Sequence, residues 1–131
     1  MACLKFTTTL ICSILFSSFA LAAPSIYGSW KTTMYYGSLK VNMKILIQEN
    51  ITYMTNVCEQ NGKTVVVSIE VPSKVEGRQY YAMDGVHQEV NEDGIYCAVK
   101  SLISPLSFVV TDTSLTFDAA LLGKLILQKT N

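Results

Sequence analysis

The sequence predicts an all-β protein whose strands form an antiparallel up-and-down β-barrel of about eight strands. Short segments in which apolar and polar residues alternate follow one another along the chain, and Gly-containing turn signals separate them. The Asn61-Gly62 pair favours a type I′ hairpin turn, in which both central residues need positive φ. No helical period occurs in residues 23–131. Closure into a barrel removes the unpaired edges of such a meander. A two-sheet β-sandwich is the alternative architecture.

Residues 1–22 have the composition of a secretory signal peptide. Lys5 provides a positive start, residues 10–16 form an apolar core, and the small-residue sequence Ala-Leu-Ala ends at Ala22. This pattern predicts cleavage between Ala22 and Ala23. The protein is therefore expected to be secreted or periplasmic.

After cleavage, residues 23–131 are expected to form a single domain. The apolar run of the leader is shorter than the about 20 residues that a membrane-spanning helix needs, so no membrane span is expected. Two other interpretations are an uncleaved signal anchor and a lipid anchor on Cys12. Ile11 argues against the lipid anchor, because bacterial lipoprotein signals place a small residue before the modified cysteine.

The charges are nearly balanced, which argues against a nucleic-acid partner. The full chain has 10 Lys plus Arg and 10 Asp plus Glu, and Lys5 leaves with the leader. The remaining charges are scattered as on an ordinary solvated surface. A protein of this composition has no electrostatic reason to bind nucleic acid or an anionic membrane.

The first three strands carry the clearest alternation. A first strand is expected over residues 29–36, before the turn signal Gly37-Ser38. Residues 39–47 form a second strand with apolar side chains at odd-numbered positions, and residues 51–58 form a third. The apolar face of this third strand is expected to contain Ile51, Tyr53, Thr55 and Val57, with Thr52 and Asn56 on the other face.

The middle of the chain predicts a fourth and a fifth strand. Residues 64–71 are rich in β-branched side chains, and Pro72, which lacks a backbone donor, is expected to end this strand or to place it at an edge. Residues 78–83 form a short aromatic strand that Asp84-Gly85 breaks or bulges. Residues 86–90 are expected to continue the same strand beyond the bulge.

The C-terminal part predicts further short strands. One begins at residue 95 after the turn signal at residues 92–94, and another covers residues 106–111. Residues 115–117 follow a tight turn, and residues 119–123 form a short helical turn or a wide loop. The last strand contains Leu125 and Leu127.

Cys58 and Cys97 are the cysteines that remain after Cys3 and Cys12 leave with the signal peptide. An exported chain with two cysteines most simply carries one disulfide. A redox pair usually has close spacing, and two thiols without clustered histidines do not make a metal site. We therefore expect a structural disulfide that ties the third strand to the strand beginning at residue 95.

The first and last strands resemble those of lipocalin-like (calycin) proteins. The resemblance rests on Gly28-Ser29-Trp30, which matches the Gly-x-Trp signature of that superfamily, and on residues 112–117 and 123–127. It implies that the Trp side chain closes one end of a barrel whose interior holds a small apolar ligand. In the family a basic residue near the last strand, usually Arg, stacks on this Trp. Lys124 or Lys129 would take that place here. The chain is too short for the family's C-terminal helix, which puts a large cavity in doubt.

The sequence offers little for catalysis. His87 is the single histidine, and no Gly-x-Ser-x-Gly nucleophile motif occurs. The carboxylate pairs near it, such as Asp84 with Glu89, lie in turn-like segments where their pKa values are difficult to tune. We expect neither enzymatic activity nor a metal ion or cofactor.

The tyrosines are candidates for surface contacts. The adjacent pairs Tyr35-Tyr36 and Tyr80-Tyr81 are each expected to place one ring inward and one outward, because neighbouring side chains alternate across a strand. Outward Tyr35, Tyr81 and Tyr96 are suited to contact a protein partner. Asn50-Ile51-Thr52 is a glycosylation sequon in a turn, relevant in a eukaryotic source.

Two functions compete for these residues. The first is binding of a small apolar molecule in the barrel interior. The second is a filled barrel that acts through its surface as a protein-binding or inhibitor module. The candidate interior residues are Trp30, Met43, Ile45, Tyr53, Val67, Ile69, Tyr80, Phe108 and Phe117.

Overall fold

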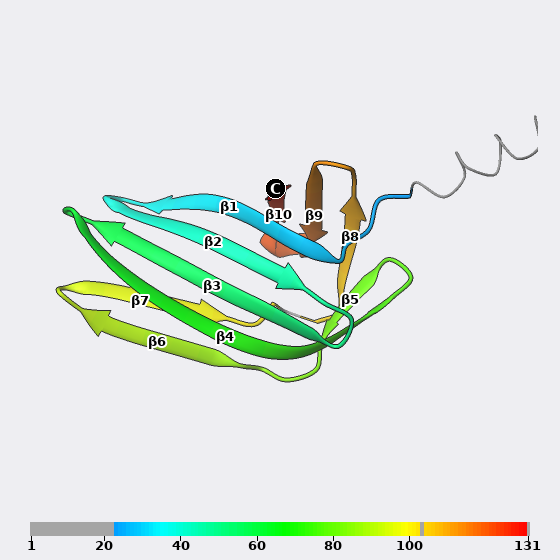
Figure 1. The fold of residues 1–131 in the computed structure, drawn as a ribbon, viewed down its shortest axis with the longest axis horizontal. Helices are drawn as coiled ribbons and strands as arrows, with labels where there is room; N and C mark the ends of the chain where they lie inside the picture. The colour runs from blue at the N-terminus through cyan, green and yellow to red at the C-terminus, as the bar shows by residue number, and fades with distance from the viewer. Residues whose placement is uncertain (1–22, 103, 131) are drawn as a thin grey trace, which may run out of the picture.

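The computed structural model describes residues 23–102 and 104–130, so the predicted signal peptide lies outside the described residues. These residues form ten strands and one short 3-10 helix, η1 (Figure 1). None of the described residues belongs to a helix that is long and apolar enough to cross a membrane. The elements are β1 Gly28–Tyr36, β2 Leu39–Ile47, β3 Ile51–Gln60, β4 Lys63–Glu76, β5 Gln79–Ala82, β6 His87–Glu92, β7 Ile95–Lys100, β8 Leu106–Val110, β9 Ser114–Asp118, η1 Ala120–Leu122 and β10 Lys124–Lys129.

Eight strands close into an antiparallel barrel in the order β1-β10-β9-β8-β5-β4-β3-β2, which confirms the predicted fold class. Strands β1 to β4 are long and pair with their sequence neighbours. Two of the other strand pairings are short, because β1 pairs with β10 only at Trp30 and Lys31, and β5 pairs with β8 only at Gln79 and Tyr80. The barrel therefore closes around one end of the four long strands, as Figure 1 shows.

Strands β6 and β7 form a separate two-stranded sheet that lies against β3 and β4 (Figure 1). The expectation that residues 86–90 continue the preceding strand is wrong, since β5 ends at Ala82 and β6 pairs only with β7. The inner face of β7 buries Ile95, Cys97 and Val99. This hairpin therefore covers the half of the long strands that the barrel leaves open.

The predicted disulfide between Cys58 and Cys97 fastens this hairpin to β3, with 5.8 Å between the two Cα atoms. Next to it, the side-chain amide of Asn56 donates a hydrogen bond to the backbone oxygen of Ala98 over 2.7 Å. The disulfide therefore joins the third strand to the strand that begins at residue 95, as the sequence predicts.

The hairpin turn at Asn61-Gly62 has the backbone conformation that these residue types favour. Asn61 and Gly62 both have positive φ, 53° and 74°, as the predicted hairpin turn requires.

Pro72 does not end its strand, although a residue without a backbone donor often does. It pairs with Ile51 of β3, and from Ser73 onward β4 pairs with β5 instead. The missing backbone donor of Pro72 thus falls where β4 changes partner, so the strand runs on to Glu76.

The prediction that the odd-numbered residues of β3 face the interior is wrong, because the even-numbered residues point inward. Thr52, Met54, Asn56 and Cys58 are buried, and Met54 pairs with the inward Ile45 of β2. Tyr53 lies half-buried on the outer face. Thr52 is tolerated inside because its hydroxyl bonds with Ser73 and Tyr80, and the Asn56 amide nitrogen bonds with Ala98, whereas Asn56 Oδ1 has no partner among the described residues.

Candidate functional site

The structure brings most of the predicted interior residues into the core. Trp30, Ile45, Val67, Ile69, Tyr80, Phe108 and Phe117 are buried, and Met43 packs against them partly buried. Tyr53 does not join them, because the face of β3 is reversed. Val67 pairs with Asn56, in the half that β6 and β7 cover, whereas Trp30, Ile45, Tyr80 and Phe117 lie within the closed part.

Aromatic side chains fill the closed part of the barrel. The rings of Tyr80 and Phe117 meet edge to face with centroids 5.5 Å apart, and those of Phe108 and Phe117 are 6.4 Å apart. Such edge contacts are the preferred packing of aromatic rings. Because Tyr80 and Phe117 are also fully buried, their rings occupy volume that an interior ligand would need.

Trp30 lies in the core, next to the N-terminal lead and to the last strand. Its side chain is fully buried, and its indole N–H donates a hydrogen bond to the backbone oxygen of Ile26 over 2.8 Å. The Nζ atom of Lys129 lies 5.5 Å from the ring centroid. Lys129, rather than Lys124, is therefore the basic residue that stacks on this Trp.

A cluster of three hydroxyl groups lies inside the barrel. The phenol of Tyr80 donates to Thr52 Oγ1 over 2.9 Å, and Thr52 Oγ1 lies 2.8 Å from Ser73 Oγ. All three residues are buried. Burial raises the pKa of Tyr80 above its ordinary value, and its hydrogen bonds with Thr52 and Ser73 offset part of that rise. Asn50, the acceptor of the sequon that contains Thr52, is exposed.

Replacing Tyr80 by Phe is expected to cost about 1 kcal/mol at neutral pH, since Thr52 and Ser73 can still bond to each other. The wild-type protein should also lose stability at alkaline pH. The unfolded chain ionises Tyr80 near pH 10 whereas the folded chain keeps the proton longer, so the contribution of Tyr80 to stability is unchanged below about pH 10 and is lost as the pH rises above it.

Urea unfolding followed between about pH 8 and pH 11 measures this effect, in a range that spans the ordinary pKa of Tyr. The Tyr80→Phe variant should lose less stability than the wild type across that range, and the exposed Tyr35→Phe control should behave as the wild type. Equal alkaline losses in Tyr80→Phe and wild type would contradict the role given to Tyr80.

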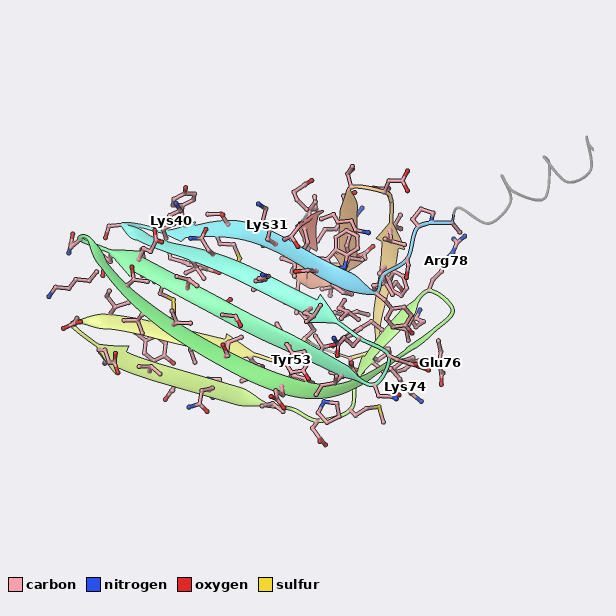
Figure 2. The ribbon with its side chains drawn as sticks, viewed as in Figure 1. Lys31, Lys40, Tyr53, Lys74, Glu76 and Arg78 are labelled. Carbon is pink, nitrogen blue, oxygen red and sulfur yellow. A yellow bond between two sulfur atoms is a disulfide. The ribbon has the colours of Figure 1, made fainter. Side chains whose placement is uncertain are left out.

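A groove of about 630 Å³ lies on the outer side of the sheet, next to the place where β1 parts from β10. Residues of β1, β2, β3 and β10 line it, and most of them are polar. Lys31 lies on β1, and in Figure 2 the strands β2 to β4 separate it from the hairpin of β6 and β7. The lining of the groove consists of Lys31, Thr32, Thr33, Asn42, Met43, Lys44, Val57, Gln128 and Thr130, so Met43, predicted for the interior, also borders this groove.

The groove is positively charged and rich in hydrogen-bonding groups. Lys31 and Lys44 are direct cross-strand neighbours, an arrangement of like charges that destabilises a sheet. No lining residue is acidic. Among residues 23–102 and 104–130, the ion pairs within 4.0 Å do not include either lysine. Thr33 Oγ1 donates to Asn42 Oδ1 over 2.8 Å. An anionic partner would relieve the repulsion between the lysines.

Sequence reasoning missed this groove, although a signal for it exists. A two-residue turn at Gly37-Ser38 pairs Tyr36 with Leu39, and that register places Lys31 opposite Lys44. The side-chain alternation then puts both lysines on the outer face. The width of the groove depends on the departure of β10 from β1, which no local pattern encodes.

A smaller, apolar recess of about 190 Å³ lies beside the loop that precedes β8. Leu106, Phe117, Ala119 and Leu125 contribute to its lining. Pockets for drug-sized ligands occupy about 300–1,000 Å³. This recess is therefore too small for a ligand of that size.

The first tyrosine pair occupies opposite faces of β1, as predicted, but neither ring is buried. Tyr35 and Tyr36 are 69% and 63% exposed. The hydroxyl group of Tyr36 donates to the sulfur of Met34, which lies 3.7 Å away. Tyr36 is the last residue of β1 before the turn, at the end of the long strands away from the closed part of the barrel. Tyr35 projects to the outer face, on the same side as Lys31.

The other candidate contact residues lie on different elements. Tyr81 is on the outer face of β5, as predicted, with the Nζ atom of Lys74 5.2 Å from its ring centroid. Tyr96 of β7 is exposed and donates a hydrogen bond to Glu89, which raises the pKa of Tyr96. Figure 1 shows β5 and the tip of β1 at opposite ends of the long strands. Tyr35, Tyr81 and Tyr96 therefore do not form one patch.

Comparisons with known proteins add no further relationship. No family model, curated protein or solved structure matches the chain. The closed antiparallel barrel of eight strands is compatible with a calycin-like fold. Within the part of the chain that the structure describes, no group of three His, Cys, Asp or Glu side chains could hold a metal ion. The function therefore has to be argued from the site.

Proposed function

We propose that the protein is an exported binding module that recognises another protein through its outer groove and has no catalytic activity. The observation that carries this proposal is the groove of about 630 Å³, which is lined by Lys31 and Lys44 without any acidic residue. This function corresponds to the surface-acting alternative of the sequence analysis. The disulfide between Cys58 and Cys97 is typical of an oxidising, exported environment.

The filled interior supports a surface function over an interior ligand. A ligand inside the barrel would have to displace rings that already contact each other, such as those of Tyr80 and Phe117. These rings are fully buried, and protein cores have few voids to accept added atoms. The apolar recess near Phe117 is only about 190 Å³.

The groove has the size and chemistry of a recognition site. Its volume of about 630 Å³ can accommodate several side chains of a partner. The exposed ring of Tyr35 lies on the same face of β1 as Lys31 and Thr33. Tyrosine next to positive and hydrogen-bonding side chains is a common composition at protein interfaces.

Reversing the charge of the groove is expected to abolish recognition. We would immobilise the mature protein, capture partners from the fluid into which the host exports it, and compare wild type with a Lys31→Glu, Lys44→Glu variant. The captured partner should bind this variant at least about tenfold more weakly, because like charges across an interface cost several kcal/mol. A Lys74→Glu, Lys124→Glu variant carries the same charge change away from the groove and should bind as the wild type does.

A second measurement addresses the interior. The mature protein is examined by native mass spectrometry and then titrated with fatty acids while the fluorescence of Trp30 is recorded. We expect no co-purifying lipid and no saturable change. A lipid-sized mass or saturable quenching at micromolar concentration would overturn the surface function in favour of an interior ligand. A partner that binds both charge variants equally would contradict recognition through the groove.

A further inference from the structure

We propose that the segment bound in the groove is an extended, acidic stretch of the partner protein that adds as a strand to the open edge of β1. This inference rests on the proposed function and specifies both the binding mode and the chemistry of the partner. Addition of a strand to a sheet edge is a recurrent mode of peptide recognition, in which main-chain hydrogen bonds provide affinity and alternate side chains provide specificity.

The edge of β1 is paired along only part of its length. β1 pairs with β2 from Gly28 to Tyr36, but with β10 only at Trp30 and Lys31. Figure 1 shows β1 continuing well past β10. Beyond Lys31, this edge has no strand partner among residues 23–102 and 104–130. A strand could therefore be added there without displacing any described element.

The register identifies the backbone groups that face the open edge. Thr130 N–H donates to the backbone oxygen of Ser29 over 2.9 Å, so the backbone groups of Ser29 face the β10 side. In a strand, every second residue directs its N–H and C=O groups to the same edge. Thr33 and Tyr35 therefore direct theirs to the part of the edge beyond β10. An incoming strand that runs antiparallel to β1 would find these groups available.

The groove lies where the side chains of such a strand would project. It is lined jointly by β1, β2 and the end of β10, which places it beside the start of the open edge. Lys31 and Lys44 contribute positive charge on the outer face, with no acidic side chain in the lining. Acidic residues at alternate positions of the incoming strand would lie on this face and complement both lysines.

A second copy of this chain is a poorer occupant. The sequence of β1, Gly-Ser-Trp-Lys-Thr-Thr-Met-Tyr-Tyr, contains no acidic residue. Pairing of β1 with its own copy would bring a further Lys31 to a groove that already holds Lys31 and Lys44. Charge complementarity therefore favours an acidic partner segment over self-association.

The probe for this inference is a synthetic peptide of about eight residues, a usual strand length, in which Glu alternates with Thr. The amide signals of the isotope-labelled mature protein are followed by NMR during titration. We expect the largest shifts at Thr33 and Tyr35, and slower hydrogen exchange of these two amides in the complex. A peptide with Lys in place of Glu should bind at least about tenfold more weakly, because like charges repel in the groove.

Two changes isolate the main-chain contacts from the charge. A peptide N-methylated at the amides that face β1 keeps every charge but cannot form the ladder, and it should lose at least about tenfold in affinity. On the protein, Thr33→Pro removes a donor that faces the open edge, where proline is tolerated in strands. Thr33→Val removes the same hydroxyl but keeps that donor, so Thr33→Pro should bind the peptide at least about tenfold more weakly than Thr33→Val does.

The outcomes separate this inference from the proposed function. Equal binding of the methylated and unmethylated peptides, or shifts confined to residues outside β1 and the groove, would overturn the added strand. Absence of binding by the alternating peptide would overturn it as well. If the partner captured from the host still depends on Lys31 and Lys44 in those cases, the groove function stands without the strand. If it does not, both fail.

Discussion

Replacing Cys58 and Cys97 together by alanine is expected to lower the free energy of unfolding by about 4 kcal/mol. The bond closes a loop of 39 residues, so it removes many conformations from the unfolded chain and thereby favours the folded one. Small domains are stable by only about 5–15 kcal/mol. The loss would therefore consume a large share of the stability of this protein.

The destabilisation should be greatest in the hairpin of β6 and β7. This hairpin forms no strand pairing with the barrel. Apart from the disulfide, packing of Ile95 and Val99 and the hydrogen bond from Asn56 to Ala98 hold it against β3 and β4. Without the disulfide, its amide hydrogens should exchange faster by a larger factor than those of β2 and β3.

Urea unfolding of the oxidised wild type, the reduced wild type and the double alanine variant measures this contribution. The control is Gln88→Ala, an exposed position of the same hairpin, which should change the stability by no more than about 0.5 kcal/mol. An unfolding free energy of the double variant within that margin would contradict the prediction. So would uniform acceleration of exchange across hairpin and barrel.

The alternation of β2 and β4 could be predicted from the sequence because it is local and unbroken. In β4, Val65, Val67, Ile69 and Val71 alternate with exposed residues over most of a long strand. The turn at Asn61-Gly62 was equally predictable, since few residue types adopt positive φ at two consecutive positions. Long strands with tight turns then leave little freedom in the order β1-β2-β3-β4.

The inner face of β3 was not predictable from its own pattern, because apolar residues occur on both of its faces. Thr52 is inside because of Tyr80 and Ser73, and Asn56 is inside because of Ala98. These partners lie 21 to 42 residues away in the sequence. One clue was nonetheless present. A disulfide-bonded cysteine is usually buried, and Cys58 shares its face with the even-numbered residues of the strand.

The sequence also did not predict that β6 and β7 form a sheet separate from the barrel. Asp84-Gly85 is compatible with a bulge inside one strand and with a break between two. The choice depends on the uncovered half of the long strands, where Val65, Val67 and Cys58 need an apolar cover. The outer groove has the same origin, since it exists only because the barrel closes at one end of the sheet.

Trp30→Ala is expected to lower the free energy of unfolding by about 3–5 kcal/mol, as large-to-small changes of aromatic core residues do. The side chain is fully buried and anchors residue Ile26 by its indole N–H. Its removal leaves a cavity beside the short β1–β10 seam, which consists of the pairs Trp30 with Lys129 and Lys31 with Gln128 and of the hydrogen bond from Thr130 to Ser29. We therefore expect this seam to open before the rest of the barrel.

Two further variants separate the contributions of the ring. Trp30→Phe keeps an aromatic ring but removes the indole donor to Ile26, and should cost less than Trp30→Ala. Lys129→Ala removes the cation above the ring and should cost about 0.5–1 kcal/mol. Because Trp30 is the single tryptophan of the chain, unfolding has to be followed by circular dichroism. A loss below about 1 kcal/mol for Trp30→Ala would show that the ring is not part of the core, since such truncations otherwise cost several times more.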